Sequence, residues 1–208
     1  MHISEGALSA SVLVGGAAIT FAGTAIGLKK LDYDRIPRVS VLTATFFVAS
    51  LIHVPVGISS AHLILNGLIG LLLGWAAFPA ILVALFLQAV LFQFGGLTTL
   101  GVNTATMAGP AVLCYYLFGA GARKTKSPLP AVFGFLCGAA AVLFSGLLVG
   151  TALILTNRAL EKPAFTVVAV HLPIMAVEGI LTAVIVSFLR AVRPEIWGVP
   201  YEKPQLQN

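Results

Sequence analysis

The sequence has little charge and few cysteines. Charged residues make up only 9% of its 208 residues, whereas hydrophobic residues make up 59%. A soluble domain carries about a quarter charged residues, so this composition cannot cover a water-facing surface. The net charge of +5 comes from bases that fall between apolar runs rather than on one basic face, which excludes nucleic-acid binding. Cys114 and Cys137 lie inside apolar runs and are typical of small core residues.

Several functional motifs are also missing. The start, MHISEG, has an acid where a secretory signal has basic residues, so we expect Met1 to be the mature N-terminus. The absence of a GxxxxGK[ST] phosphate loop predicts that the chain does not hydrolyse ATP itself. Because the sequence also has no HExxH motif and no acid beside a histidine, we assign no catalytic residue and expect no enzyme.

Long apolar runs dominate the remainder of the chain. A helix needs about 20 apolar residues to cross a bilayer, or fewer where it stops short. Seven such runs cover 7–28, 39–53, 62–76, 79–94, 104–120, 130–156 and 165–190. The sequence therefore predicts an all-α polytopic protein of the inner (plasma) membrane, with about seven transmembrane helices in a single metal-binding domain over residues 1–208.

The basic residues predict the orientation. Ten of the twelve follow the first, fifth and seventh runs and so share one side: Lys29, Lys30, Arg35, Arg38, Arg123, Lys124, Lys126, Arg190, Arg193 and Lys203. The other two, Arg158 and Lys162, fall on the opposite side. Since cytoplasmic loops carry the excess of Lys and Arg, we expect the N-terminus outside and the C-terminus in the cytoplasm.

Two joints between the short middle runs are uncharged and rich in glycine and hydroxyls. They read HVPVGISSA at 53–61 and FGGLTTLGVN at 94–103. Irregular backbone at membrane depth is tolerated where it is buried in protein or lines a wet cavity. We therefore expect folded-in loops that surround an outer-facing recess, with ordinary external loops as the alternative.

His2 carries the most specific chemistry. A histidine at position two offers one metal ion the terminal amine of Met1, its own backbone amide and its imidazole Nδ1. Fused five- and six-membered chelate rings hold these nitrogens in one plane, and one further nitrogen completes a square. Square-planar nitrogen ligands favour Ni(II) or Cu(II), and Co(II) also accepts imidazole.

The other three histidines all fall toward the same predicted side. His62 is the best candidate for the fourth ligand because it follows the Gly-Ser loop, and Asn66 would share its helix face four residues on. His53 and His171 could contribute to the pocket, or could be ordinary interfacial histidines.

Glu178 is an acid inside an apolar run, which makes it a functional candidate or a hydrogen-bond acceptor between helices. We expect it to lie too far from the outer loops to bind the metal, and to act in packing or in conformational coupling. Gln88 and Asn103 are further polar anchors in apolar surroundings.

Four segments carry a resemblance across nearly the whole chain: MHISEG at the start, SSAHL at 59–63, FGGLTTLGVNT at 94–104 and HLPIMAVEGILT at 171–182. Together they resemble the CbiM/NikM family, the substrate-binding membrane (S) components of cobalt and nickel energy-coupling-factor (ECF) transporters. Some members read SHPTG where this chain has AHLIL after Ser60, so the groups around the metal differ there.

The resemblance implies a seven-helix protein whose N-terminal segment enters an outer-facing pocket. Met1, His2 and a loop histidine, matched here by His62, would bind Co²⁺ or Ni²⁺ as the transported substrate. Asn103, in the GGLTTLGVN loop, would support the site. The implied partners are a transmembrane coupling (T) subunit, ATP-binding subunits and a small extra membrane subunit.

Three other functions remain as alternatives. A stand-alone metal channel would need no ATPase. A vitamin-binding S component would call for aromatic and hydrogen-bonding residues and would have no use for His2. An intramembrane metallohydrolase would use histidines and Glu178 around a metal, but this sequence has no HExxH motif.

Overall fold

A computed structural model describes residues 2–51, 53–56, 59–124 and 129–197. Within these residues the regular elements are helices and one short hairpin of two antiparallel strands. The elements are α1 (Ala10–Lys29), α2 (Ile36–Ala49), β1 (His53–Val56), β2 (Ser59–His62), α3 (Asn66–Leu73), α4 (Ala77–Phe92), α5 (Leu100–Lys124), α6 (Leu129–Thr156) and α7 (Glu161–Val192). Short 3₁₀ turns cover Tyr33–Arg35, Gly74–Ala76, Arg158–Leu160 and Pro194–Trp197.

The protein is a multi-pass membrane protein. Five helical segments of the described chain are long and apolar enough to cross a bilayer: Ala10–Lys29, Asn66–Phe92, Leu100–Arg123, Leu129–Thr156 and Arg158–Val192. Large apolar side chains cover their outer faces; Phe21 of α1, for example, is 78% exposed, as expected where lipid is the solvent. The helices occur where the sequence predicts them, but α2 has only 14 residues and is not among the five segments.

The third and fourth predicted spans form one broken segment. The chain turns at Gly74, whose φ of 58° and ψ of −125° strongly favour glycine. The Arg123 guanidinium donates to the carbonyl of Leu71 at 2.7 Å and lies over the ring of Tyr115. Because the side chain binds one of the last carbonyls of α3, it stabilises the end of this short helix.

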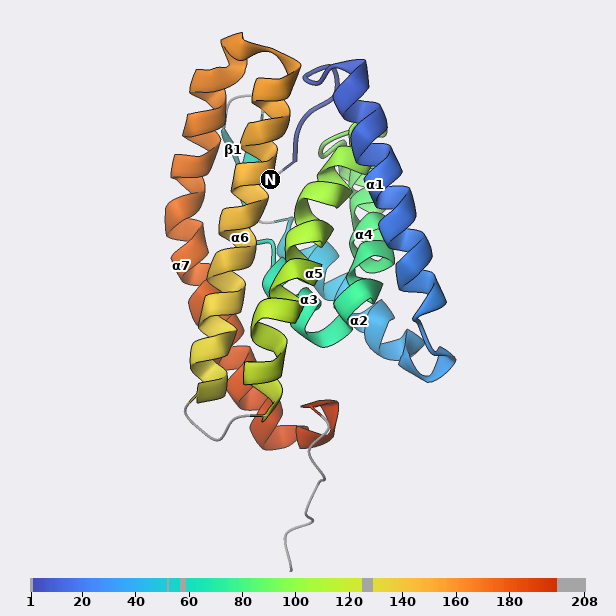
Figure 1. Ribbon diagram of the computed structural model, residues 1–208, viewed down its shortest axis with the longest axis vertical. Coiled ribbons are helices and arrows are strands. Elements are labelled where there is room, and N and C mark those ends of the chain that lie inside the picture. Colours follow the sequence, from blue (N-terminus) through green and yellow to red (C-terminus); the bar gives the residue numbers. More distant parts are fainter. Residues whose placement is uncertain (1, 52, 57–58, 125–128, 198–208) are drawn as a thin grey trace, which may run out of the picture.

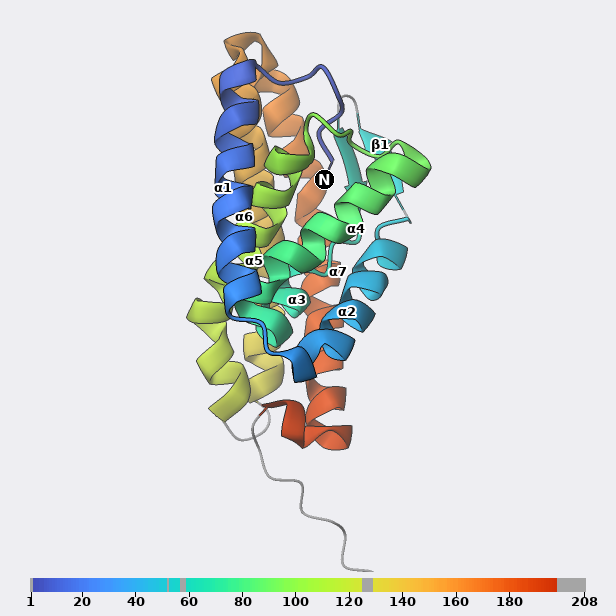
Figure 2. The same cartoon turned by 90° about the vertical axis from the view of Figure 1, so that its right-hand side faces the viewer.

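The helices pack as an elongated bundle (Figures 1 and 2). In Figure 1, α6 and α7 form a hairpin on one side, α5 lies in the middle, and α1 covers the other side with α4 behind it. The β1–β2 hairpin and the first residues of the chain lie in the half that contains Arg158–Leu160, whereas α5 and α7 end in the opposite half. Among the described bases, Arg123, Arg190 and Arg193 thus lie in the half opposite Arg158 and Lys162, as the sequence predicts. Which half faces the cytoplasm stays a prediction.

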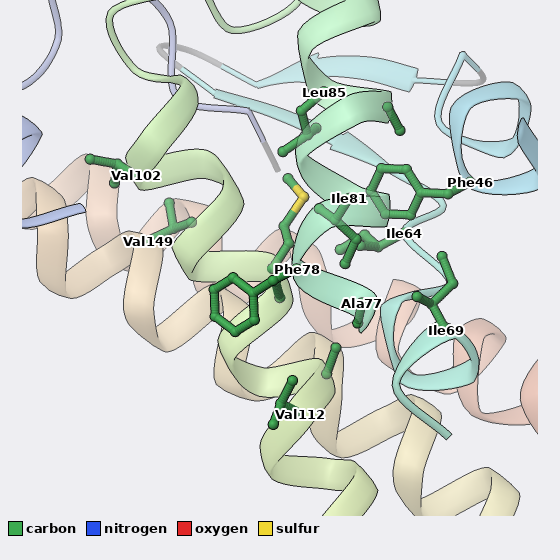
Figure 3. Packing of buried hydrophobic residues seen from close by; sticks show 14 of the residues in the cluster. Phe46, Ile64, Ile69, Ala77, Phe78, Ile81, Leu85, Val102, Val112 and Val149 are labelled. Carbon is green, nitrogen blue, oxygen red and sulfur yellow. The ribbon is translucent and has the colours of Figure 1, made fainter. Parts of the chain in front are cut away.

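The core lies where α4 crosses α5 and meets α2, α3 and α6 (Figure 3). Phe78, Ile81 and Leu85 of α4 pack against neighbouring helices and are almost completely buried. The short α3 lies close to α5 because residue 70 is glycine. A Cβ there would lie 2.1 Å from the carbonyl oxygen of Ala111. Close packing of small residues replaces hydrophobic burial as the main source of helix association in a bilayer.

Candidate metal centre

The first residues fold into the bundle beside the hairpin rather than extending from it (Figure 2). The side chain of His2 is only 4% exposed and Ile3 is fully buried. The Glu5 amide donates to the carbonyl of Gly95 at 3.2 Å, and the Thr98 amide donates to Oε1 of Glu5 at 3.1 Å. The N-terminal segment, defined here as residues 2–9, is therefore docked on the loop between α4 and α5.

Asn103 binds both the backbone amide and the backbone carbonyl of one residue in this segment, Ile3. Its Oδ1 accepts from the Ile3 amide at 2.9 Å, and its Nδ2 donates to the Ile3 carbonyl at 3.1 Å. Thr99 Oγ1 donates to the same carbonyl at 2.9 Å. Since Asn103 and Thr99 are both buried, the segment satisfies polar groups that would otherwise be costly inside the bundle. Asn103 thus anchors the N-terminal segment, and its role beside a metal ion stays a prediction.

A glycine in the loop makes room for the segment. Gly95 has a φ of +78°, and a Cβ at this position would lie 2.9 Å from Nδ2 of Asn103 and 3.5 Å from the His2 side chain. A larger residue would therefore be strained and would also crowd the side chains that hold the segment. The first part of the predicted loop at 94–103 lies here against the buried N-terminal segment, whereas Leu100–Asn103 belong to α5. The outer-facing recess stays a prediction.

The ring of His2 contacts Gln88, which the sequence predicts only as a polar anchor. His2 Nε2 lies 2.8 Å from Oε1 of Gln88, and the ring centroid lies 6.2 Å from that of Phe94. The Gln88 amide nitrogen in turn contacts Ser50 Oγ and the Phe47 carbonyl. The presence of an amide in the otherwise apolar α4 is the signal that could have identified this contact.

The second predicted part of the site lies in the hairpin. In β1 and β2 the backbone positions of His53 and His62 are directly opposite each other. The prediction that His53 ends one helix and His62 begins the next is wrong, because α2 ends at Ala49 and α3 begins at Asn66. His62 and Asn66 therefore do not share a helix face. The side chains of His53 and His62 lie outside the described part of the structure.

Glu178 binds the chain just after β2. Its carboxylate accepts from the backbone amides of Ile64 and Leu65, with distances of 2.9 and 3.0 Å to the latter. The expectation that Glu178 lies far from the outer loops is wrong because the segment after β2 penetrates to this depth before α3 begins. Leu65 has a φ of 51°, which separates the strand from the helix. Glu178 is thus a buried anchor for the strand that carries His62.

Asn66 and His171 take structural positions. Asn66 Nδ2 donates to the Met107 carbonyl at 3.1 Å and to Ser145 Oγ at 2.9 Å, which fixes the start of α3 between α5 and α6. His171 is 3% exposed, and its Nδ1 lies 2.6 Å from the carbonyl of Val167, one turn earlier on α7. Its Nε2 makes no hydrogen bond within the described residues.

The described residues do not by themselves complete a ligand set. Among them, no group of three His, Cys, Asp or Glu side chains could hold a metal ion. Met1 and the side chains of His53 and His62 lie outside the described part of the chain, so the set of Met1, His2 and His62 stays a prediction. The described residues supply its surroundings: a buried His2, a ring partner, and anchors on both segments that carry predicted ligands.

Comparison with known proteins identifies related chains. Residues 2–196 match the family CbiM, described as "Cobalt uptake substrate-specific transmembrane region". A putative metal transport protein of Haemophilus influenzae is 41% identical, over 94% of this chain and 96% of its own. The cobalt transport protein CbiM of Sorangium cellulosum is 32% identical, over 94% of each chain.

The comparisons extend to nickel proteins and to solved structures. A fused nickel transport protein, NikMN, of Rhodobacter capsulatus is 33% identical over 94% of this chain, which matches 63% of that longer protein. The crystal structure of a transition metal transporter has a TM-score of 0.70 at 26% identity, covering 92% of this chain and 93% of its own.

Proposed function

The chain belongs to the CbiM/NikM family of transmembrane components for cobalt and nickel uptake, and from this premise we propose how it captures its ion. In this proposal the Met1 amine, the His2 amide and Nδ1, and the His62 imidazole bind Co²⁺ or Ni²⁺ in one plane at an outer-facing site. The chain then passes the ion inward as the substrate-specific subunit of an ECF-type transporter. A transport component of this kind is not an enzyme.

The observation that carries the proposal is the burial of His2 next to Gln88. A histidine near a chain end is ordinarily exposed, because terminal residues are poorly ordered unless they are tied down. Here the ring is 4% exposed and its Nε2 lies 2.8 Å from an amide oxygen. Metal-binding histidines usually make such a hydrogen bond through the ring nitrogen that does not bind the metal.

Both cobalt and nickel fit the proposed ligands. Imidazole and amide nitrogens accept either ion, and affinity alone favours Ni²⁺ over Co²⁺. The relatives include proteins named for each metal. Discrimination between the two ions therefore depends on the geometry of the ligands rather than on their chemical types.

The decisive experiment inserts the dipeptide Leu-Pro between Met1 and His2. The leucine protects Met1 from excision, and the proline has no N–H that a metal ion could replace, so fused chelate rings cannot join the Met1 amine to the imidazole of His2. We expect the protein, purified with a C-terminal tag, to bind one Ni²⁺ or Co²⁺ ion in equilibrium dialysis, and the insertion to abolish this binding without changing the thermal unfolding temperature.

An alanine inserted between Gly6 and Ala7 is the matched control. It leaves the sequence up to Glu5 intact, and the space around Gly6 is open, with no atom within 4 Å of a Cβ placed there. We expect this variant to keep most of its binding. If the first insertion also binds normally, the chelate is excluded and the site has to be sought among His53, His62 and His171.

The proposed partners need a separate test in cells. We propose that uptake requires a T subunit and ATP-binding subunits, with a small extra membrane subunit as an additional component. Uptake of radioactive Co²⁺ or Ni²⁺ should therefore occur when the chain is expressed with these subunits and should be absent when it is expressed alone. Uptake by the chain alone would instead support the stand-alone channel.

A further inference from the structure

Gln88 lies between His2 and α2 and is completely buried. Its Oε1 atom is 2.8 Å from Nε2 of His2, while its amide nitrogen contacts Ser50 Oγ and lies 3.4 Å from the Phe47 carbonyl. A neutral imidazole carries its proton on either Nδ1 or Nε2, and its hydrogen-bond partner selects between the two. The direction of the hydrogen bonds around Gln88 therefore determines the form of His2.

The direction begins at the end of α2. The Ser50 hydroxyl lies 2.8 Å from the Phe46 carbonyl and 3.1 Å from the Phe47 carbonyl. A carbonyl oxygen can only accept a hydrogen bond, and a hydroxyl has a single proton to donate. Since this proton points to the helix carbonyls, Ser50 Oγ faces Gln88 as an acceptor.

This acceptor fixes the orientation of the Gln88 amide. The end of the side chain that faces Ser50 Oγ and the Phe47 carbonyl has to be the NH₂ group, because an oxygen there would meet two acceptors. The Gln88 oxygen consequently faces His2. An amide oxygen has no proton to donate, so Nε2 of His2 is the donor in the hydrogen bond between them.

We propose that Gln88 is a positioning residue that holds His2 in the form protonated at Nε2, with the lone pair on Nδ1. The inference rests on the proposed function, in which Nδ1 closes a six-membered ring with the amide of the same residue. A ring protonated at Nδ1 would have to lose or move that proton before it could bind the ion. Gln88 thus presents the nitrogen that the chelate needs.

The first test measures the ring directly and needs no metal. The metal-free protein is labelled with ¹⁵N-histidine and embedded in lipid nanodiscs, and its spectrum is recorded well above the ordinary imidazole pKa of about 6.5. The ¹⁵N shift separates protonated from unprotonated ring nitrogens, and a His2→Gln variant assigns the signal. We expect a protonated Nε2. A protonated Nδ1 in the wild-type protein would overturn the inference whatever the variants do.

The second test removes the hydrogen bond. Gln88→Met keeps the length of the side chain but offers His2 no oxygen, so we expect a mixture of the two ring forms. Ni²⁺ affinity should fall about 10- to 100-fold, as when other hydrogen-bond partners of metal ligands are removed. Gln88→Glu retains an oxygen toward His2, and the Ser50 hydroxyl can turn its proton toward the second carboxylate oxygen. The Nε2-protonated form should therefore persist, which separates the loss of the acceptor from a change in packing.

Gln93→Met is the matched control, because Gln93 is exposed and lies just beyond the end of the same helix. It should change neither the ring form nor the affinity. If Gln88→Met also leaves both unchanged, Gln88 has no positioning role. The Leu-Pro insertion after Met1 keeps the two proposals distinct. Loss of binding there together with a protonated Nδ1 would retain the chelate and reject the role of Gln88.

Discussion

The two segments that carry the predicted ligands are anchored in different ways. The N-terminal segment with His2 is held by side chains from one neighbouring region, the end of α4 and the start of α5, through Gln88 and Asn103. The segment that follows His62 is held from α7, on the other side of the bundle, where Glu178 accepts hydrogen bonds from two of its backbone amides. In Figure 1 the N-terminal residues lie between α7 on one side and α4 and α5 on the other.

The difference predicts how the two segments respond to substitution. The N-terminal segment is held by several neutral hydrogen bonds from different side chains, each of which contributes about 1 kcal/mol. In the segment after β2, one buried carboxyl group accepts from two backbone amides, so a single substitution removes both hydrogen bonds. We therefore expect the second anchor to be the more sensitive to a single substitution.

The largest effect should follow Glu178→Leu. The substitution leaves the amides of Ile64 and Leu65 without their acceptor, and an unsatisfied buried donor costs roughly 1–3 kcal/mol. We expect a clear fall in the thermal unfolding temperature in detergent, and a loss of Ni²⁺ binding because the strand with His62 is released.

Two variants make this result specific. Glu178→Gln keeps one acceptor oxygen and should lose less stability than Glu178→Leu. Glu161→Leu, at the exposed start of the same helix, should unfold near the wild-type temperature. If Glu178→Leu is as stable as the wild type, the carboxylate does not anchor the segment, and the contrast between the two regions disappears.

An intermediate effect should follow Gly95→Ala, which acts on the N-terminal segment. The new Cβ would lie 2.9 Å from Nδ2 of Asn103. The alanine would also have to adopt a backbone conformation with positive φ, which costs a residue other than glycine about 1–2 kcal/mol. We expect weaker Ni²⁺ binding and faster hydrogen exchange at the amides of Ile3 and Glu5, measured by mass spectrometry of the N-terminal peptide.

Gly6→Ala is the matched substitution for this measurement. Gly6 has a φ of +76°, nearly the same as Gly95, but no atom lies within 4 Å of the added Cβ. It should therefore report the cost of the backbone conformation alone. Equal exchange in the two variants would mean that contact with Asn103 does not hold the segment in place.

The smallest effect should follow His171→Phe. The His171 ring is bonded to the Val167 carbonyl of its own helix rather than to either segment. We expect equilibrium dialysis to give an unchanged Ni²⁺ affinity, whereas His62→Phe should remove most of the binding. A loss with His171→Phe as large as that with His62→Phe would place His171 among the ligands.

Local pattern was sufficient to predict the helices but not the chain between them. Apolar runs identified α1, α5, α6 and α7 to within a few residues at most of their ends, because a bilayer requires helices of a narrow range of lengths. The hairpin at 53–62 was missed. The sequence predicts an irregular loop there, with His53 and His62 at the ends of the flanking helices, because strands of four residues are too short to show a clear alternating pattern.

Candidate residues were found from the sequence more readily than their roles. Polar residues in apolar surroundings are costly and rare, so Gln88, Asn103 and Glu178 are conspicuous in the sequence. Their partners Ser50, Ile3 and Leu65 are not visible there, because they lie 38, 100 and 113 residues away along the chain. Glu178 in particular was expected to act away from the loops, yet it binds one of them.

The sequence by itself determined that this protein is a helical membrane protein with a histidine at position two. It could do so because hydropathy and the types of potential ligand are properties of local residue order. Only the tertiary structure decided that His2 is buried, that Gln88 faces it, and that a carboxylate of α7 holds the strand of His62. Those contacts join distant segments, and the close packing of helices sets which of them meet.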